Sequence, residues 1–191
     1  FVWEVGGTEA FVVNNDVRLH GATIALLAEA RRVTDALFVS AVGVQSESEL
    51  TFGIDLSNPA MIGKGGPDFS CFLISKEGHE KYPFDPGFEP AFCEDLDMHR
   101  RYMLGGDGDK IFSVNVPYLH YASQTLKTMS PDQRARVDRQ ITERSRAHYQ
   151  AKWGGPVNQE RYTIKGDPES AQDGVTTPEL QRAGVLINGT E

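Results

Sequence analysis

Long apolar runs, cysteine and net positive charge are all scarce in this 191-residue chain. No apolar run approaches the ~20 residues that a helix needs to cross a bilayer, so the sequence predicts no membrane-spanning helix. The formal charge is −8, from 27 acidic and 19 basic residues. An acidic chain lacks the basic surface that nucleic-acid binding requires. We therefore expect a cytoplasmic protein with no nucleic-acid partner.

Cysteine is limited to Cys71 and Cys93. Neither belongs to a C-x-x-C pair, which argues against a zinc site or a thioredoxin-like site. Both lie among apolar residues, where a free cysteine is usually buried. We expect two buried thiols in a reducing compartment, and a disulfide between them stays open as the alternative.

Apolar segments alternate with helical patterns along the first 155 residues, which we expect to form one domain, followed by a polar tail over 156–191. Strands separated by helices, mostly apolar on both faces, predict an α/β sheet flanked by helices. The strands are expected within 9–17, 36–44, 49–56, 69–75 and 110–121. The helices are expected over 21–32, 91–104 and 130–152, with one helical turn in 76–83. In such sheets the chemistry gathers at strand ends.

The first candidate site follows the first strand, where the sequence reads Asn14-Asn15-Asp16. A carboxylate flanked by amides can hold a hard divalent cation through oxygen and leave room for phosphate and water. The same residues are also favoured in an ordinary turn that ends a strand. Taken alone, the turn is the better interpretation.

The second candidate is the stretch "FCEDLDMHRR", which places Glu94 and Asp95 at the start of a predicted helix. Acidic residues in the first turn and basic ones in the last stabilise the helix dipole, by about 0.3–1 kcal/mol each, so the order of charges needs no function. An aromatic-rich loop, "FDPGFEPAF", leads directly into these carboxylates. A carboxyl near apolar walls has a raised pKa and suits a general base.

The third candidate is His120, at the end of the last predicted strand. A single histidine near aromatic residues is more often packed or solvated than a ligand. Its weight rises if it meets Asp16 in space, because histidine and carboxylate together suit Mn²⁺ or a similar ion.

Taken in order, "VVNND", "CFLISKEGHEKYPFDPGFEPAFCEDLDMHRR", "YLHYAS" and "HYQAKWGG" resemble the family 2 glycosyltransferases, over about residues 9–155. The resemblance implies a Rossmann-like, A-type glycosyltransferase fold with a mixed sheet flanked by helices. It implies transfer of a sugar from a nucleotide-sugar donor to a glycan, lipid-linked or protein acceptor, with inversion at the anomeric carbon.

The resemblance also implies roles for particular residues. Asp16 and His120 would hold a divalent metal, Mn²⁺ or Mg²⁺, with Asn14 and Asn15 beside the donor. Asp95 would deprotonate the acceptor hydroxyl, and Glu94 would assist or position it. Lys152 and Trp153 would close over the donor, which is a weaker transfer of roles.

Two features depart from the family pattern. Tyr82-Pro83 stand before "FD" where the family usually has an apolar residue and glycine, and 58–68 is unusually rich in glycine. Only 13 residues precede Asn14, whereas one βαβ unit takes about 30. We therefore expect the fold to be incomplete at its N-terminus, with the nucleotide-binding part outside this chain. Nucleotide sugar would then bind weakly, and an N-terminal segment, a second chain or a second copy of this chain would cover the exposed sheet edge.

Two alternatives to a glycosyltransferase stay open. A non-catalytic glycan- or protein-binding module would keep the same scaffold without turnover. A metal phosphoesterase built on Asp16 and His120 would need more ligands than the sequence displays.

Overall fold

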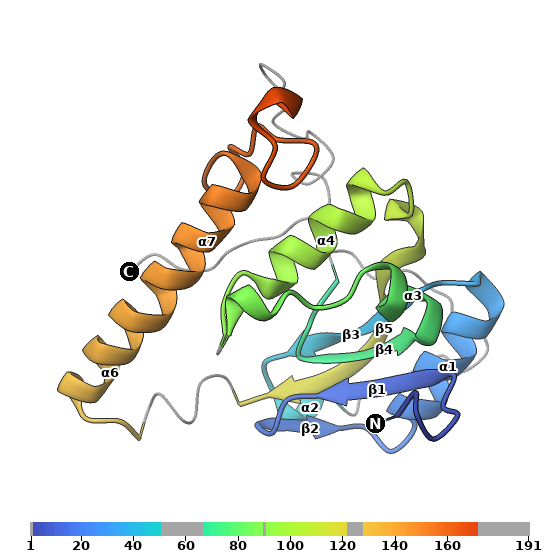
Figure 1. Ribbon diagram of the computed structural model, residues 1–191. Coiled ribbons are helices and arrows are strands. Elements are labelled where there is room, and N and C mark those ends of the chain that lie inside the picture. The colour runs from blue at the N-terminus through green and yellow to red at the C-terminus, as the bar shows by residue number, and fades with distance from the viewer. Residues whose placement is uncertain (1, 51–66, 90, 122–127, 172–191) are drawn as a thin grey trace.

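A mixed five-stranded sheet with helices on both faces forms the centre of the protein, in a computed structural model that describes residues 2–50, 67–89, 91–121 and 128–171 (Figure 1). The strand order is β1-β4-β3-β5-β2. The strands are β1 Glu9–Val13, β2 Val17–Leu19, β3 Phe38–Val44, β4 Cys71–Ser75 and β5 Ile111–His120. The expected α/β class with a mixed, helix-flanked sheet is confirmed.

The two long strands β3 and β5 run parallel, and every other pair in the sheet is antiparallel. The β3–β5 register places Val44 opposite Leu119, so both strands end at the same edge of the sheet. β2 pairs antiparallel with the end of β5, with Val17 opposite His120. The carboxyl ends of the two parallel strands are therefore the place where this fold collects loops and polar side chains.

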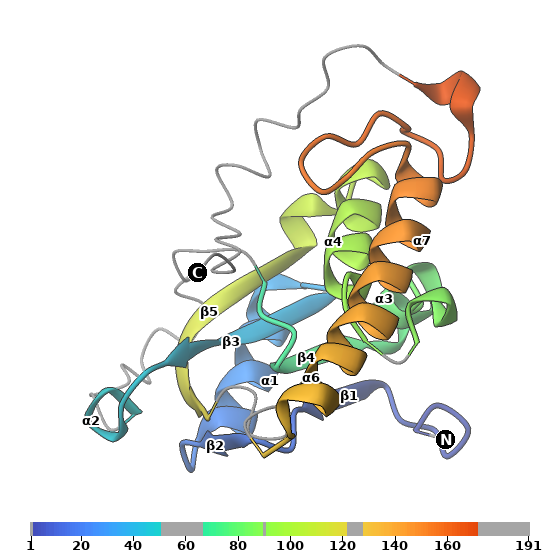
Figure 2. The same ribbon diagram turned by 90° about the vertical axis from the view of Figure 1, so that its left-hand side faces the viewer.

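The pleat of β3 separates two apolar cores because successive side chains point to opposite faces. On one face Val39 packs with Leu27 and Ala30 of helix α1, Thr23–Thr34. On the other face Phe38 packs with Met98 and further side chains of helix α4, Glu94–Leu104. The turned view shows α1 and α4 on opposite sides of the sheet (Figure 2).

The remaining helices are α2 Glu47–Leu50, α3 Lys76–Lys81, α6 Pro131–Val137 and α7 Arg144–Trp153, with a π-helical segment over Asp138–Glu143 between the last two. The predicted start of the long C-terminal helix is confirmed, because Ser130 and Gln133 form a capping box and Pro131 takes the first position. Its predicted end is confirmed as well. The helix stops at Trp153, where Gly154 adopts a left-handed conformation with φ of 72°.

Three expectations from the sequence differ from the structure. The first strand was expected to be buried, but β1 pairs with β4 alone and leaves Val12 and Val13 about 40% exposed. The strand expected over 49–56 begins within the short helix α2, and 51–56 lie outside the described residues. The expected polar tail is ordered in its first part, where Glu160 is buried and pairs with Arg100 of α4.

Both cysteines are free thiols, so the disulfide alternative is not realised. Cys71 is buried in β4, as expected, whereas Cys93 is half-buried at the start of α4. In the described parts of the chain, no helix has the length and apolar character that crossing a membrane requires.

Candidate functional site

Asp16 and His120 meet at one edge of the sheet although they lie 104 residues apart in the chain. Asp16 ends the turn between β1 and β2, and His120 is the last residue of β5. Because β2 pairs with the end of β5, the imidazole Nε2 comes within 3.1 Å of the Asp16 Oδ1 atom. His120 therefore does meet Asp16 in space, which is the condition under which the sequence favours a metal-binding role for this histidine.

Asn14 and Asn15 stand in the same turn and are both exposed. The backbone N–H of Asn14 donates a hydrogen bond to the backbone carbonyl of Ser70, which ties the turn to the start of β4. This contact fixes the backbone of the turn and leaves both amide side chains on the surface. Their expected role beside a donor therefore remains a prediction.

A pocket of about 270 Å³ opens beside this pair, at the carboxyl ends of β3 and β5. Its lining includes Gly43, Asp68, Tyr118 and His120. A Cβ atom at Gly43 would stand 3.3 Å from the Tyr118 hydroxyl and 3.5 Å from Asp68 Oδ2. A larger residue there would narrow the pocket, so the glycine keeps it open. We call this the strand-end pocket.

Asp68 is a polar residue of the strand-end pocket that no sequence motif marks. Its carboxylate accepts a 2.6 Å hydrogen bond from the Tyr118 hydroxyl and a 2.8 Å bond from the Ser70 amide. Its own amide donates to the Ser40 hydroxyl at 2.8 Å. Burial is the main cause that raises the pKa of Tyr118, and the nearby charge of Asp68 adds to it. The phenol therefore stays protonated and donates its hydrogen bond to Asp68. Asp68 is therefore held rigidly, with its charge at the pocket wall.

The start of α4 is the second part of the site, and its backbone is strained. Phe92 and Cys93 both have left-handed φ values, 77° and 68°, which cost of order 1–3 kcal/mol each for residues other than glycine. Cys93 is the N-cap residue, and its side chain makes no capping hydrogen bond. Strain of this kind persists where the surrounding structure imposes a backbone path. Here that path delivers Glu94 and Asp95 to the first turn of the helix.

Glu94 and Asp95 both have raised pKa values. Burial is the main cause for each carboxyl; the neighbouring charge of Asp95 adds to the shift of Glu94, and that of Asp68 to the shift of Asp95. Within the part of the chain that the structure describes, Glu94 Oε2 is buried without a hydrogen-bond partner. Asp95 Oδ1 accepts from the Leu96 amide at 2.8 Å. A carboxyl with a raised pKa is a stronger base once it is deprotonated, so both groups suit proton abstraction.

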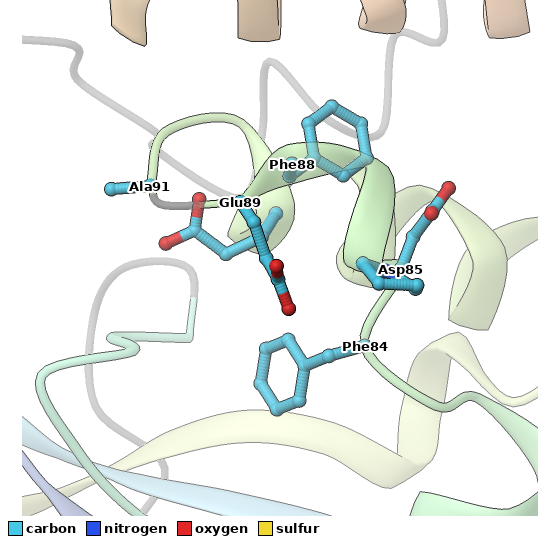
Figure 3. A pocket seen from close by; sticks show the side chains of 7 residues that line it. Phe84, Asp85, Phe88, Glu89 and Ala91 are labelled. Carbon is cyan, nitrogen blue, oxygen red and sulfur yellow. The ribbon is translucent and has the colours of Figure 1, made fainter.

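A second pocket, of about 240 Å³, lies at the start of α4. Figure 3 shows Glu89 directed toward the ring of Phe84, while Phe88 and Asp85 point away from that space. Glu94 also lines this pocket. We call it the loop pocket, because the loop before α4 builds most of it.

The start of α4 is linked to both pockets. Glu94 lines the loop pocket, and its neighbour Asp95 feels the charge of Asp68 in the strand-end pocket. The rings of Phe84 and Phe69 are in edge contact, with centroids 6.3 Å apart, and Phe69 follows Asp68 in the chain. The first turn of α4 therefore reaches the loop pocket through Glu94 and is linked electrostatically, through Asp95, to Asp68 of the strand-end pocket.

Lys152 and Trp153 lie in a buried polar network. The Lys152 ammonium is 2.6 Å from Asp85 Oδ2 and 2.7 Å from Asp97 Oδ1, and the Trp153 indole donates to the same Asp97 atom at 2.9 Å. These contacts join α7 to α4 and to the loop around Asp85, in agreement with the positions of α4 and α7 in Figures 1 and 2. The polar atoms expected to close over a donor are thus engaged with protein, and their donor role stays a prediction.

The sequence predicted Asp16, His120, Glu94 and Asp95 as site residues, but Asp68, Tyr118, Phe84 and Glu89 were missed. Phe84 and Glu89 lie in the quoted aromatic loop, so the motif itself was the available signal. Asp68 follows a stretch rich in glycine and proline that offers no comparable signal. Comparison of the chain with models of known protein families and with curated proteins finds no match.

Proposed function

We propose that this protein is a metal-dependent, inverting glycosyltransferase that moves a sugar from a nucleotide-sugar donor to an acceptor hydroxyl. The observation that carries the proposal is the first turn of α4, where Glu94 lines the loop pocket and Asp95, also with a raised pKa, is close enough to Asp68 of the strand-end pocket to be affected by its charge. A transferase that acts by direct displacement needs two substrate sites with a base between them. The sequence resemblance points to the same chemistry.

The strand-end pocket is the proposed donor site. Asp16 and His120 offer one oxygen and one nitrogen 3.1 Å apart, and two ligands ~2.1 Å from one octahedral ion at right angles stand ~3 Å from each other. The described residues contain no group of three or more candidate metal ligands, so the remaining positions would go to donor phosphates and water. When bound, the metal supplies charge neutralisation for the leaving diphosphate.

Asp95 is the proposed base. It takes the proton from the acceptor hydroxyl, whose oxygen then attacks the anomeric carbon of the donor from the face opposite the leaving group. One displacement with one base inverts the configuration at that carbon. Glu94, next to Asp95 and open to the loop pocket, orients the acceptor.

The finer fold assignment belongs to this proposal too. An A-type, Rossmann-like glycosyltransferase sheet places its metal site at the carboxyl ends of parallel strands. Here β5, which runs parallel to β3, ends at His120, the partner of Asp16. The edge of β1, with its exposed Val12 and Val13, is where we place a further segment, a partner chain or a second copy of this chain. We also propose a cytoplasmic location.

A glycan-binding module without turnover is the second candidate. The exposed ring of Phe84, in a pocket that also holds carboxylates, favours this candidate. Such a surface can recognise sugars without any nucleotide-sugar donor. A panel of sugar nucleotides, offered with Mn²⁺ and then with excess chelator, separates the two. Release of nucleoside diphosphate that requires the metal supports the transferase, whereas saccharide binding without release from any donor supports the module.

A further inference from the structure

The loop pocket carries an inference about the acceptor, and this inference rests on the proposed function. Its aromatic part is Phe84, which is 36% exposed although two other rings support it from within the protein. The Phe69 ring contacts Phe84 edge-on at 6.3 Å, and the Phe72 ring lies 6.2 Å away. Phe84 is therefore a fixed apolar platform with one open surface.

Carboxylates form the other part of the loop pocket. Glu89 is exposed and directed toward the Phe84 ring (Figure 3). Glu94 brings Oε2, a buried atom without a hydrogen-bond partner among the described residues. Asp85 accepts hydrogen bonds from the Lys152 ammonium and the Gly87 amide, so its negative charge is already paired within the protein. An unpartnered buried oxygen at a pocket wall marks a position where a ligand would supply the missing hydrogen bond.

The chemistry of this pocket selects one class of ligand. The face of an aromatic ring is electron-rich and attracts weakly positive C–H groups, such as those on one face of a sugar ring. Ionised carboxylates accept hydrogen bonds and donate none, so they match hydroxyl groups. The same negative charges repel phosphate, uronate and other acidic groups.

We propose that the loop pocket binds an uncharged sugar ring of a carbohydrate acceptor, which stacks on Phe84 and donates hydroxyl hydrogen bonds to Glu89 and Glu94. The acceptor is thus a neutral saccharide in the part that enters the protein. Asp95, the proposed base, is the next residue along the first turn of α4.

The test is saturation-transfer NMR on the 191-residue chain with a panel of neutral disaccharides, among them cellobiose, lactose, maltose and N,N′-diacetylchitobiose, and with uronate-containing disaccharides of matched linkage. We expect at least one neutral disaccharide to receive saturation on one ring face, and the acidic ones to receive none. Phe84→Ala should reduce the signal at least tenfold, and Glu89→Gln severalfold. Glu89 is exposed, so this second variant keeps its fold.

Matched controls come from the same chain. Val33→Ala removes another exposed apolar side chain, on α1, and Glu80→Gln another exposed carboxylate, and neither residue lines the pocket. Both should leave the signal unchanged. Binding that survives Phe84→Ala, preference for acidic disaccharides, or no binding across the neutral panel would each overturn the inference.

This experiment also separates the inference from the proposed function. Metal-dependent release of nucleoside diphosphate without neutral saccharide binding would remove the acceptor assignment and keep the transferase. Saccharide binding on Phe84 without release from any donor would keep the subsite and remove the transferase.

Discussion

The ammonium of Lys152 lies 2.7 Å from Oδ1 of Asp97, a carboxylate with no exposed surface. Asp97 also accepts from Arg101 at 2.9 Å and from the Trp153 indole. The same ammonium reaches Asp85, a residue of the loop pocket whose Oδ1 atom accepts from the Gly87 amide. One lysine therefore couples the C-terminal helix, the helix that carries Glu94 and Asp95, and the loop before it.

Lys152→Met should destabilise the protein by at least about 1.5–3 kcal/mol, the value of one hydrogen bond to a charged group, because such a bond is lost at each of two carboxylates. Asp97 keeps Arg101 and Trp153 as partners, so we expect a lower midpoint in urea rather than an unfolded protein. Lys165→Met, at an exposed lysine, is the control and should stay within about 0.5 kcal/mol of wild type. Equal midpoints for the two variants would show that the network adds no stability.

Asp85 should resist protonation in the folded protein. Burial opposes its ionisation, but hydrogen bonds from Lys152, the Gly87 amide and His148 outweigh this and lower the pKa. A carboxyl with a lowered folded pKa adds stability above its unfolded pKa, and that stability is lost as pH falls through the folded value. NMR titration of the Asp85 carboxyl should show it still ionised where exposed aspartates are protonated. A titration midpoint in the ordinary range would contradict this ion pair.

The acids at the start of α4 should behave in the opposite way. Burial raises the pKa of both Glu94 and Asp95 in the folded state, so their cost to stability grows as pH rises from the unfolded pKa through the folded one. Glu94→Gln and Asp95→Asn should therefore raise the Tm at neutral pH. Each unit of raised pKa corresponds to about 1.4 kcal/mol, and each kcal/mol to roughly 2–4 °C in a protein of this size.

Thermal scans across pH provide the check on that prediction. The gain in Tm should vanish at acidic pH, where the wild-type carboxyls are protonated as well. Glu80→Gln, at an exposed carboxylate, should show no comparable gain. A lower Tm for both α4 variants at neutral pH would mean that the charges stabilise the helix dipole more than burial disfavours them.

Asp16→Asn and His120→Ala should each lower the affinity for Mn²⁺ by at least tenfold, because each removes one of two ligands brought within 3.1 Å. Titration calorimetry with Mn²⁺ measures this without any substrate. Asp35→Asn, an exposed aspartate at the end of α1, is the control. Unchanged Mn²⁺ affinity in both site variants would leave Asp16 as a turn residue that hydrogen-bonds a histidine.

Both thiols should react slowly in the native protein. Burial raises the pKa of Cys71 to about 12 and that of Cys93 to about 11, so little thiolate is present at neutral pH. A thiol reagent should label both cysteines rapidly in denaturant and Cys71 more slowly than Cys93 without it. Fast native labelling of Cys71 would contradict its placement in the sheet.

Sequence reasoning succeeded where the determining contacts are local. The Ser130 capping box and the stop at Gly154 depend on residues within one helical turn, so their patterns are legible in the chain. The meeting of Asp16 and His120 was expected from a different regularity, because side chains at strand ends gather at one edge of a sheet.

The rest depended on contacts between distant segments. The edge position of β1 follows from its pairing with β4, about 60 residues later in the chain, and an apolar run does not reveal which neighbours it will have. The position of the Asp68 carboxylate depends on a hydrogen bond from the Tyr118 hydroxyl, which lies 50 residues away in the chain. Lys152 bonds to Asp85 and Asp97 for the same reason, since only the folded chain brings α7 against α4.

The most direct measurement of the central claim is the rate of nucleoside diphosphate release by wild type and by Asp95→Asn, on the gene product at its full encoded length. Both would receive the same sugar nucleotide, neutral saccharide acceptor and Mn²⁺. Asparagine keeps the shape and the Oδ1 acceptor of Asp95 but takes no proton at neutral pH. The account predicts a loss of 10²–10⁴-fold, the usual effect of removing a general base, with an unchanged Mn²⁺ affinity. A folded variant that releases the product at close to the wild-type rate would contradict it.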